Sequence, residues 1–163
     1  MNVIKFIRLG NSVKLKGFNS DASGFENSIL PYIKAHHTKA LILGTGGASK
    51  AICFVLNKLG IETCYVSRTA APGRLTYSDL NEEILNAYTI IVNASPVGTY
   101  PKSDECPDIP YLFLSDKHLL FDVVYNPAET LFLKLGREQG AVGINGEPML
   151  IGQAITAWEI WNL

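Results

Sequence analysis

The sequence predicts a doubly wound α/β domain, in which helices cover both faces of a parallel sheet. Two observations support this fold class. Short apolar segments alternate with helical segments from residue 39 onward, and a glycine-rich turn joins the first of these strands to the following helix. Buried strands separated by helices pair in parallel through right-handed crossovers. An N-terminal β-hairpin and a C-terminal helix are predicted outside this alternation.

The first predicted element is the β-hairpin. Residues 3–8 and 12–16 are rich in side chains that favour β-structure. Gly10-Asn11 between them supplies the positive φ that a tight turn needs. We therefore expect two antiparallel strands in this part of the chain.

Two predicted helices flank the alternating region. Apolar spacing indicates one over residues 22–30, with Asp21 or Ser23 as its N-cap. The other covers residues 149–161, and Pro148 stands near its first position. The apolar face of this last helix is too broad for a lone surface helix. We expect part of that face to meet a partner.

The strands and helices of the predicted sheet domain lie between these two helices. A proline-rich loop interrupts the alternation after its third strand. Asp79 followed by Glu82 is typical of a capping box at a helix start. In order, the predicted elements are strand 40–43, helix 48–59, strand 63–67, helix 79–86, strand 89–93, strand 119–124, helix 130–139 and strand 141–144.

The composition limits the class of protein. A chain of 163 residues fits one domain and is too short for a complete two-domain enzyme. The 14 Lys and Arg residues nearly balance the 15 Asp and Glu residues, so bulk charge favours neither nucleic acid nor a membrane surface. Apolar residues make up 47% of the chain, enough for a packed core. Without a membrane-length apolar run or a signal peptide, we expect a cytoplasmic protein.

The cysteines and histidines predict no metal site. The 3 cysteines form no C-x-x-C pair, which favours structural thiols over a disulfide framework or a zinc site. His36, His37 and His118 have no Asp, Glu or Cys partner at ligand spacing. We expect all three histidines on the solvated surface.

The glycine-rich turn predicts a dinucleotide site, because it follows a strand and opens a helix. The first glycine can make the tight turn, and the next can let the backbone approach a pyrophosphate at the helix N-terminus. Ser49 stands where the commonest spacing has a third glycine, and it is small enough for close packing. The alternative is a glycine-rich turn without a ligand. The residues of the turn are Gly44, Thr45, Gly46, Gly47 and Ala48.

The end of the next strand predicts the choice of cofactor. NAD-dependent enzymes place an acidic residue there to bind the ribose 2′-hydroxyl. This chain has Ser67, Arg68 and Thr69 instead. A guanidinium donates charge-assisted hydrogen bonds to a 2′-phosphate, so Arg68 favours NADP. The alternative is a solvated surface arginine.

Six ordered motifs together resemble shikimate dehydrogenases over essentially the whole chain. The resemblance implies a Rossmann-like fold and reversible hydride transfer between NADPH and 3-dehydroshikimate, a step of aromatic amino acid biosynthesis through chorismate. The matching stretches are GFNSDASG at 17–24, GTGGA at 44–48, SRT at 67–69, NASPVG at 93–98, DVVYNPAET at 122–130, and GEPMLIGQA at 146–154.

The same resemblance implies roles for individual residues. Asp21 would pair with a catalytic lysine at the substrate hydroxyl, and the substrate-lining residues would be Asn2, Asp21, Tyr125 and Gln153. The family's second arginine for the 2′-phosphate would fall at Pro72, and Arg74 is a candidate to replace it. The cofactor-binding residues would be Gly44, Thr45, Gly46, Gly47, Ala48, Ser67, Arg68, Thr69, Asn93, Ser95, Val123 and Gly146.

Simpler roles compete with three of these assignments. Asp21 is also a good helix N-cap. Tyr125 could be a core tyrosine with a hydrogen-bonded hydroxyl. Gln153 could be a buried amide bound by backbone.

The resemblance also predicts an incomplete enzyme. Residues 1–20 would be the remnant of a substrate-binding domain, residues 21–147 the NADP-binding domain, and residues 148–163 a helix left over from the missing domain. The lysine partner of Asp21 would belong to that missing domain, so we expect the chain alone to be inactive, with its last helix exposed or used in a homodimer. The alternatives are a non-catalytic nucleotide-binding or interaction module and a relative acting on quinate.

Overall fold

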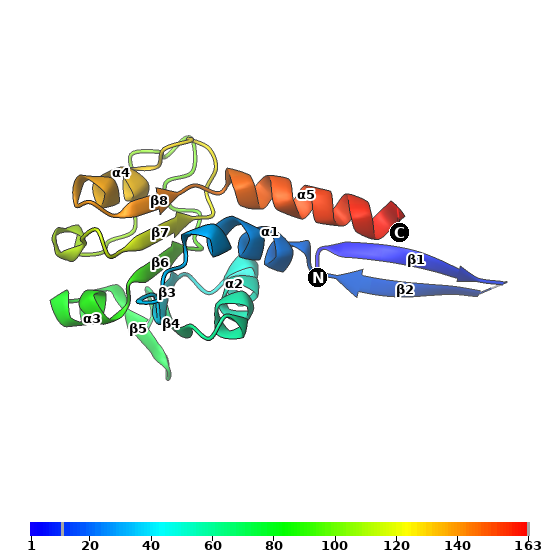
Figure 1. Ribbon diagram of the computed structural model, residues 1–163, viewed down its shortest axis with the longest axis horizontal. Helices are drawn as coiled ribbons and strands as arrows, with labels where there is room; N and C mark the ends of the chain where they lie inside the picture. Colours follow the sequence, from blue (N-terminus) through cyan, green and yellow to red (C-terminus); the bar gives the residue numbers. More distant parts are fainter. Residues whose placement is uncertain (11, 163) are drawn as a thin grey trace.

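The computed structural model describes residues 1–10 and 12–162, and its centre is a parallel sheet of six strands (Figure 1). The strand order is β5-β4-β3-β6-β7-β8, which confirms the predicted doubly wound sheet. The chain order reverses between β3 and β6, so a crevice is expected beyond the carboxyl ends of these two strands. The strands are β3 (Lys39–Leu43), β4 (Glu62–Ser67), β5 (Arg74–Thr76), β6 (Ile90–Asn93), β7 (Leu119–Asp122) and β8 (Val142–Ile144).

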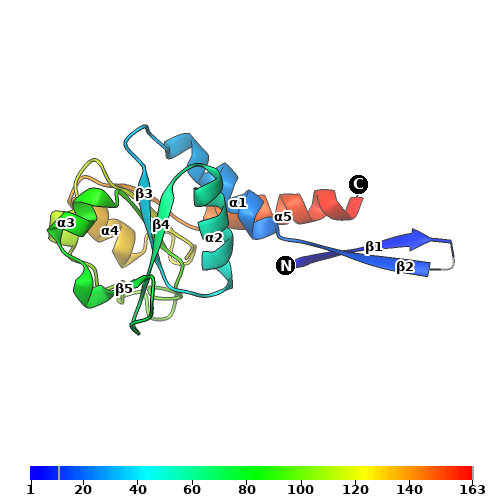
Figure 2. The same cartoon turned by 90° about the horizontal axis from the view of Figure 1, so that it is seen from below.

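Helices cover both faces of this sheet (Figure 2). The helices α1 (Ser20–Ile29), α2 (Gly47–Lys58) and α5 (Glu147–Asn162) pack on one face, and α3 (Glu82–Ala87) and α4 (Leu131–Glu138) on the other. Alternate residues of β3 supply the two cores: Ile42 belongs to the first and Leu41 to the second. Among the helices of the described residues, none is long and apolar enough to cross a membrane.

The N-terminal hairpin projects away from the sheet (Figures 1 and 2). Its strands are β1 (Val3–Leu9) and β2 (Ser12–Phe18), paired antiparallel as predicted, and Gly10 has φ +61°. Asn11, the other predicted turn residue, lies outside the described residues. The indole Nε1 of Trp161 donates to the Ile4 carbonyl (3.2 Å), which links the end of α5 to the hairpin.

The predicted N-cap of the first helix is wrong. Asn19, rather than Asp21 or Ser23, caps α1, because its side chain accepts a hydrogen bond from the Asp21 amide (3.1 Å). The Asp21 carboxylate is instead bound by Asn2 (2.8 Å). Asn and Asp are equally good caps, so spacing alone could not choose between them.

The predicted start of the third helix is also wrong. Asp79 closes a capping box with Thr76 around a 3₁₀ turn, Tyr77–Asp79. Asn81 then caps α3, which begins at Glu82. The edge strand β5, missed in the sequence, has three residues and too few side chains to show a pattern.

Two of the three histidines are buried, which corrects their predicted place on the solvated surface. His37 accepts from the Lys34 amide through Nδ1 (3.0 Å), and His118 accepts from the Ser115 amide in the same way (3.0 Å). Their Nε2 atoms therefore donate to the Lys117 and Leu85 carbonyls. Imidazole can bind one backbone amide and one backbone carbonyl at once, here a local amide and a carbonyl far away in sequence, so both ring nitrogens are paired in the interior.

Helices α1 and α5 cross where Gly24 lies against the backbone of α5. A Cβ on Gly24 would be 2.6 Å from the Met149 carbonyl oxygen and 3.0 Å from the Gln153 nitrogen. We predict that Gly24→Ala lowers the free energy of unfolding by about 1–3 kcal/mol, since helix backbones must separate to admit the methyl group. Urea unfolding measures this effect. Gly47→Ala is the control, because a Cβ there meets nothing within 4 Å; equal stability of the two variants would contradict the prediction.

Candidate functional site

The turn after β3 meets the turn after β6 at the carboxyl edge of the sheet. Gly44 has φ +110°, and its amide donates to the Val66 carbonyl (2.9 Å). A Cβ on Gly44 would lie 3.3 Å from the Ala94 carbonyl group. The predicted role of this glycine in a tight turn is confirmed, because both its φ and its surroundings disfavour a side chain.

The N-terminus of α2 is open to solvent. Gly46 caps the helix without a side-chain hydrogen bond, and Gly46 and Gly47 are both exposed. The first-turn amides are therefore free to bind an anion, which the helix dipole favours. Ser49 is fully buried, and its hydroxyl donates to the Gly46 carbonyl (2.7 Å). The serine at the third-glycine position thus packs without closing the turn, and the site fits a pyrophosphate.

The turn after β4 holds the predicted cofactor-selecting residues. The Ser67 hydroxyl donates to the Thr69 carbonyl, which closes the turn around Arg68. Arg68 is exposed, and no carboxylate of residues 1–10 and 12–162 forms an ion pair with it. Arg74 is exposed on the neighbouring strand β5, beside Tyr65 of β4. Both guanidinium groups are therefore available to a ligand.

A buried polar network joins the ends of β6 and β7. Asp122 Oδ1 accepts from Asn93 Nδ2 (2.9 Å) and from the Val124 amide (3.0 Å), and its Oδ2 accepts from the Thr130 hydroxyl (2.6 Å). The Asn93 side-chain oxygen accepts from the Ser95 amide (3.1 Å) and hydroxyl (2.6 Å). The hydrogen-bonding groups of the Asn93 side chain are thus all bound by the protein itself, and Ser95 lies nearer to solvent.

This network perturbs the acidity of Asp122. Burial raises the pKa of the carboxyl to about 6, although hydrogen bonds from Thr130, Val124 and Asn93 act in the opposite direction. The partners are neutral donors, so desolvation outweighs them. In the sequence, Asp122 and Thr130 appeared only as members of a family motif, and no role was predicted for either residue. The signal was a single acidic residue at the end of an otherwise apolar strand.

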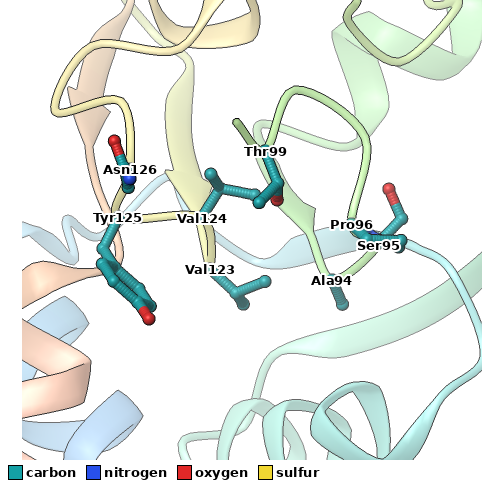
Figure 3. A pocket seen from close by; sticks show the side chains of 8 residues that line it. All are labelled: Ala94, Ser95, Pro96, Thr99, Val123, Val124, Tyr125 and Asn126. Atoms are coloured by element: carbon teal, nitrogen blue, oxygen red, sulfur yellow. The ribbon is translucent and has the colours of Figure 1, made fainter. Parts of the chain in front are cut away.

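A hollow of about 330 Å³ opens between the loops after β6 and β7 (Figure 3). Tyr125 is 52% exposed, so its alternative assignment as a core tyrosine is wrong. Its ring extends from the loop on the side of α1 and α5 (Figure 3). Gly146 is buried against the Val123 carbonyl, where a Cβ would lie only 2.1 Å away. The residues that line the hollow are Ala94, Ser95, Pro96, Thr99, Val123, Val124, Tyr125 and Asn126.

The other predicted substrate residues gather at the junction of the hairpin, α1 and α5. Asn2 Nδ2 donates to Asp21 Oδ1 (2.8 Å), and Asn2 Oδ1 accepts from the Ser20 amide (2.8 Å). Gln153 is half-buried on α5, at the crossing with α1. Among the described residues, no hydrogen bond joins the Asn2–Asp21 pair to Tyr125. The structure therefore brings together Asn2 and Asp21, with Tyr125 on a separate loop.

The charge of Asp122 should have a measurable effect on stability. Because the pKa of Asp122 in the folded protein (about 6) exceeds the ordinary value of 3.8, the protonated carboxyl stabilises the fold. This contribution is fully present below pH 3.8 and is lost as pH rises through about 6. From about one pH unit below 3.8 to about one unit above 6, the free energy of unfolding of the wild type should fall by roughly 3 kcal/mol relative to Asp122→Asn. Urea unfolding of both proteins across this range measures the difference. A difference that does not change with pH would contradict the prediction.

The chain is similar to curated shikimate dehydrogenases, although no protein-family model matches it. It is 34% identical over 164 residues to the NADP(+) enzyme of Methanosphaera stadtmanae, a match that covers 90% of this chain and 58% of that protein. The NADP(+) enzyme of Clostridium botulinum is 37% identical over 159 residues, covering 92% and 61%. The chain spans less than two thirds of the length of these relatives.

Solved structures give the same result. The Thermus thermophilus shikimate 5-dehydrogenase, in complex with NADP(H) and shikimate, superposes with a TM-score of 0.77 at 29% identity over 91% of this chain and 58% of that one. A quinate dehydrogenase from Corynebacterium glutamicum, in complex with NAD, gives 0.76 at 25% identity over 90% and 57%. With some nine tenths of the chain aligned in both kinds of comparison, the resemblance seen in the six motifs is confirmed: the chain is homologous to the C-terminal portion of shikimate dehydrogenases.

Proposed function

We propose that the chain binds NADP(H) as the cofactor-binding part of a shikimate dehydrogenase, which transfers hydride reversibly between NADPH and 3-dehydroshikimate. One observation carries this proposal: the open N-terminus of α2 and the exposed Arg68 lie at the carboxyl ends of neighbouring strands, β3 and β4. An open helix N-terminus suits the pyrophosphate, and a free guanidinium suits the 2′-phosphate. Solved neighbours include complexes with NADP and with NAD, so the preference for NADP rests on Arg68.

The remaining cofactor contacts follow the edge of the sheet. The turn at residues 44–48 would hold the pyrophosphate, and residues 67–69 the adenosine ribose. Ser95, Val123 and Gly146 would lie along the nicotinamide half, with Asn93 holding Ser95 in place. Bound NADPH supplies the hydride, and the residues of this chain orient and enclose it.

The substrate half of the proposed site comprises Asn2, Asp21, Tyr125 and Gln153. The Asp21 carboxylate would hold a protonated lysine at the substrate hydroxyl, and the exposed Tyr125 phenol would contact the substrate. None of the lysines in these residues stands in a motif matching the family's catalytic lysine. We therefore propose that this chain has no dehydrogenase activity on its own. Activity would need the part of a shikimate dehydrogenase that the match does not cover.

The proposed division of the chain places residues 1–20 and 148–163 with the substrate domain. Both segments carry exposed apolar side chains: Phe6 is 69% exposed, Leu15 59% and Trp158 66%. Exposed apolar surface of this kind marks an interface. A substrate domain, or a second copy in a homodimer, would cover it.

Arg68→Ala should weaken NADPH binding by about 1–3 kcal/mol, the value of a charge-assisted hydrogen bond. NADH binding should change little, because NADH lacks the 2′-phosphate. Titration of each protein with NADPH and NADH, followed by nucleotide fluorescence, measures both affinities. Arg8→Ala is the matched control, since Arg8 is an exposed arginine on the distant hairpin. Equal affinity of the wild type for the two nucleotides, or no binding, would count against the role of Arg68.

Addition of a substrate domain from a homologous shikimate dehydrogenase should restore shikimate-dependent reduction of NADP. The expected result is activity with the mixture and none with either part alone, because the lysine and Asp21 act together. Parallel assays with quinate test the alternative substrate, which the quinate dehydrogenase neighbour favours. Failure of every mixture, with nucleotide binding intact, would support a non-catalytic module instead.

A further inference from the structure

The Asp122 carboxylate contacts both loops that line the hollow. We propose that Asp122 is a positioning residue for the nucleotide site: through Asn93 it sets the loop after β6 against the loop after β7, and its protonation loosens both loops. This inference rests on the proposed function, which places the nicotinamide half of the cofactor beside these loops. It adds an acid-sensitive group that does not itself touch the ligand.

The first arm of the network runs from Asp122 to Ser95. The Asn93 amide donates to Asp122 Oδ1 (2.9 Å) and to the Val97 carbonyl (3.2 Å). Its oxygen cannot replace the NH₂ group, because that oxygen already accepts two hydrogen bonds from Ser95. The orientation of Asn93, and with it the turn at residues 93–97, therefore depends on an acceptor at Asp122.

The second arm closes the loop that carries Tyr125. The Val124 amide donates to the same oxygen as Asn93 (3.0 Å), and the Thr130 hydroxyl donates to the other oxygen (2.6 Å). Thr130 is also the N-cap of α4, through the Leu133 amide (3.4 Å). One carboxylate thus holds both ends of residues 122–130.

A proton on the Asp122 carboxyl would face groups that already donate hydrogen bonds to it. Among the described residues, its hydrogen-bond partners are all donors. The titratable group facing it is the Tyr111 phenol, which donates to the Pro107 carbonyl (2.8 Å) and whose pKa is raised by burial. A proton on Oδ2 forces the Thr130 hydroxyl to turn round, and the neutral carboxyl accepts weaker hydrogen bonds from Asn93 and Val124.

The charge of Asp122 is retained against a folding penalty. Burial raises the pKa of the carboxyl to about 6, so the ionised form destabilises the fold at neutral pH. A carboxyl with a perturbed pKa beside a hollow is a functional-site candidate. A pKa of about 6 also lies within the pH range in which nucleotide binding can be measured.

The experiment measures NADPH affinity between about pH 5 and pH 8 for the wild type, Thr130→Val, Thr130→Ser and Asp122→Asn. In the wild type, affinity should fall as pH drops through about 6, the pKa of Asp122. Thr130→Val removes one donor to the carboxylate and should raise the midpoint by about one pH unit, which is about fivefold weaker binding at pH 6 and nearly tenfold at about pH 5. Thr130→Ser keeps the hydroxyl and should restore the wild-type midpoint.

The remaining comparisons separate a positioning role from a structural one. Asp122→Asn should bind weakly and lose the midpoint due to this carboxyl. The NADPH 2′-phosphate also titrates near pH 6, but it is common to all four proteins and cancels between them. A purely structural Thr130 would lower stability without moving the midpoint. Identical midpoints in wild type, Thr130→Val and Thr130→Ser would overturn the inference.

A second measurement does not need the nucleotide. In the ligand-free wild type, the NMR amide signals of Ser95 and Val124 should shift with the same midpoint as the Asp122 carboxyl carbon. This titration still decides the inference if Thr130→Val does not fold. A Ser95 signal that does not follow Asp122 would overturn the inference, whatever the nucleotide results. Absence of NADPH binding with coupled titration would overturn the proposed function alone.

Discussion

The close contact between the turns after β3 and β6 is the constraint on which the candidate site depends. Gly44 approaches the Ala94 carbonyl so closely that a Cβ would lie 3.3 Å from it. The approach leaves the first turn of α2 open at the edge of the sheet. A larger residue would push the two turns apart and displace the helix N-terminus from the crevice, so the candidate anion site depends on this close approach.

Much of this arrangement was predictable from the sequence, because the signals were local. Alternating strands and helices, a glycine turn in its strand–helix context and Arg68 at a strand end each depend on a few neighbouring residues. The errors arose where two local solutions are nearly equal in free energy. Asn19 and Asp21 are both good N-caps, and only the contact of Asp21 with Asn2, 19 residues away in sequence, decides between them. The burial of His118 likewise depends on the Leu85 carbonyl, 33 residues away.

The hairpin and α5 form their secondary structure although many of their apolar side chains are not buried. Backbone pairing gives β1 and β2 a full register, and the Trp161 indole links α5 to β1. Several apolar side chains of both elements nevertheless remain exposed, with Phe6 and Trp158 each about two thirds accessible. Hydrogen bonds within the ribbon fix its shape, whereas its exposed apolar side chains have the character of an interface.

The chemistry of the Asp122 network explains why its position suits a carboxylate and no neutral isostere. Three donors from two loops converge on this side chain. An asparagine offers one acceptor oxygen, and its NH₂ group would face either the Thr130 hydroxyl or the pair formed by Asn93 and the Val124 amide. A leucine of similar size would leave all three donors unsatisfied in the interior, a larger penalty than desolvation of one charge shared by three hydrogen bonds. The ionised carboxylate is therefore the arrangement that satisfies both loops, even though burial opposes its charge.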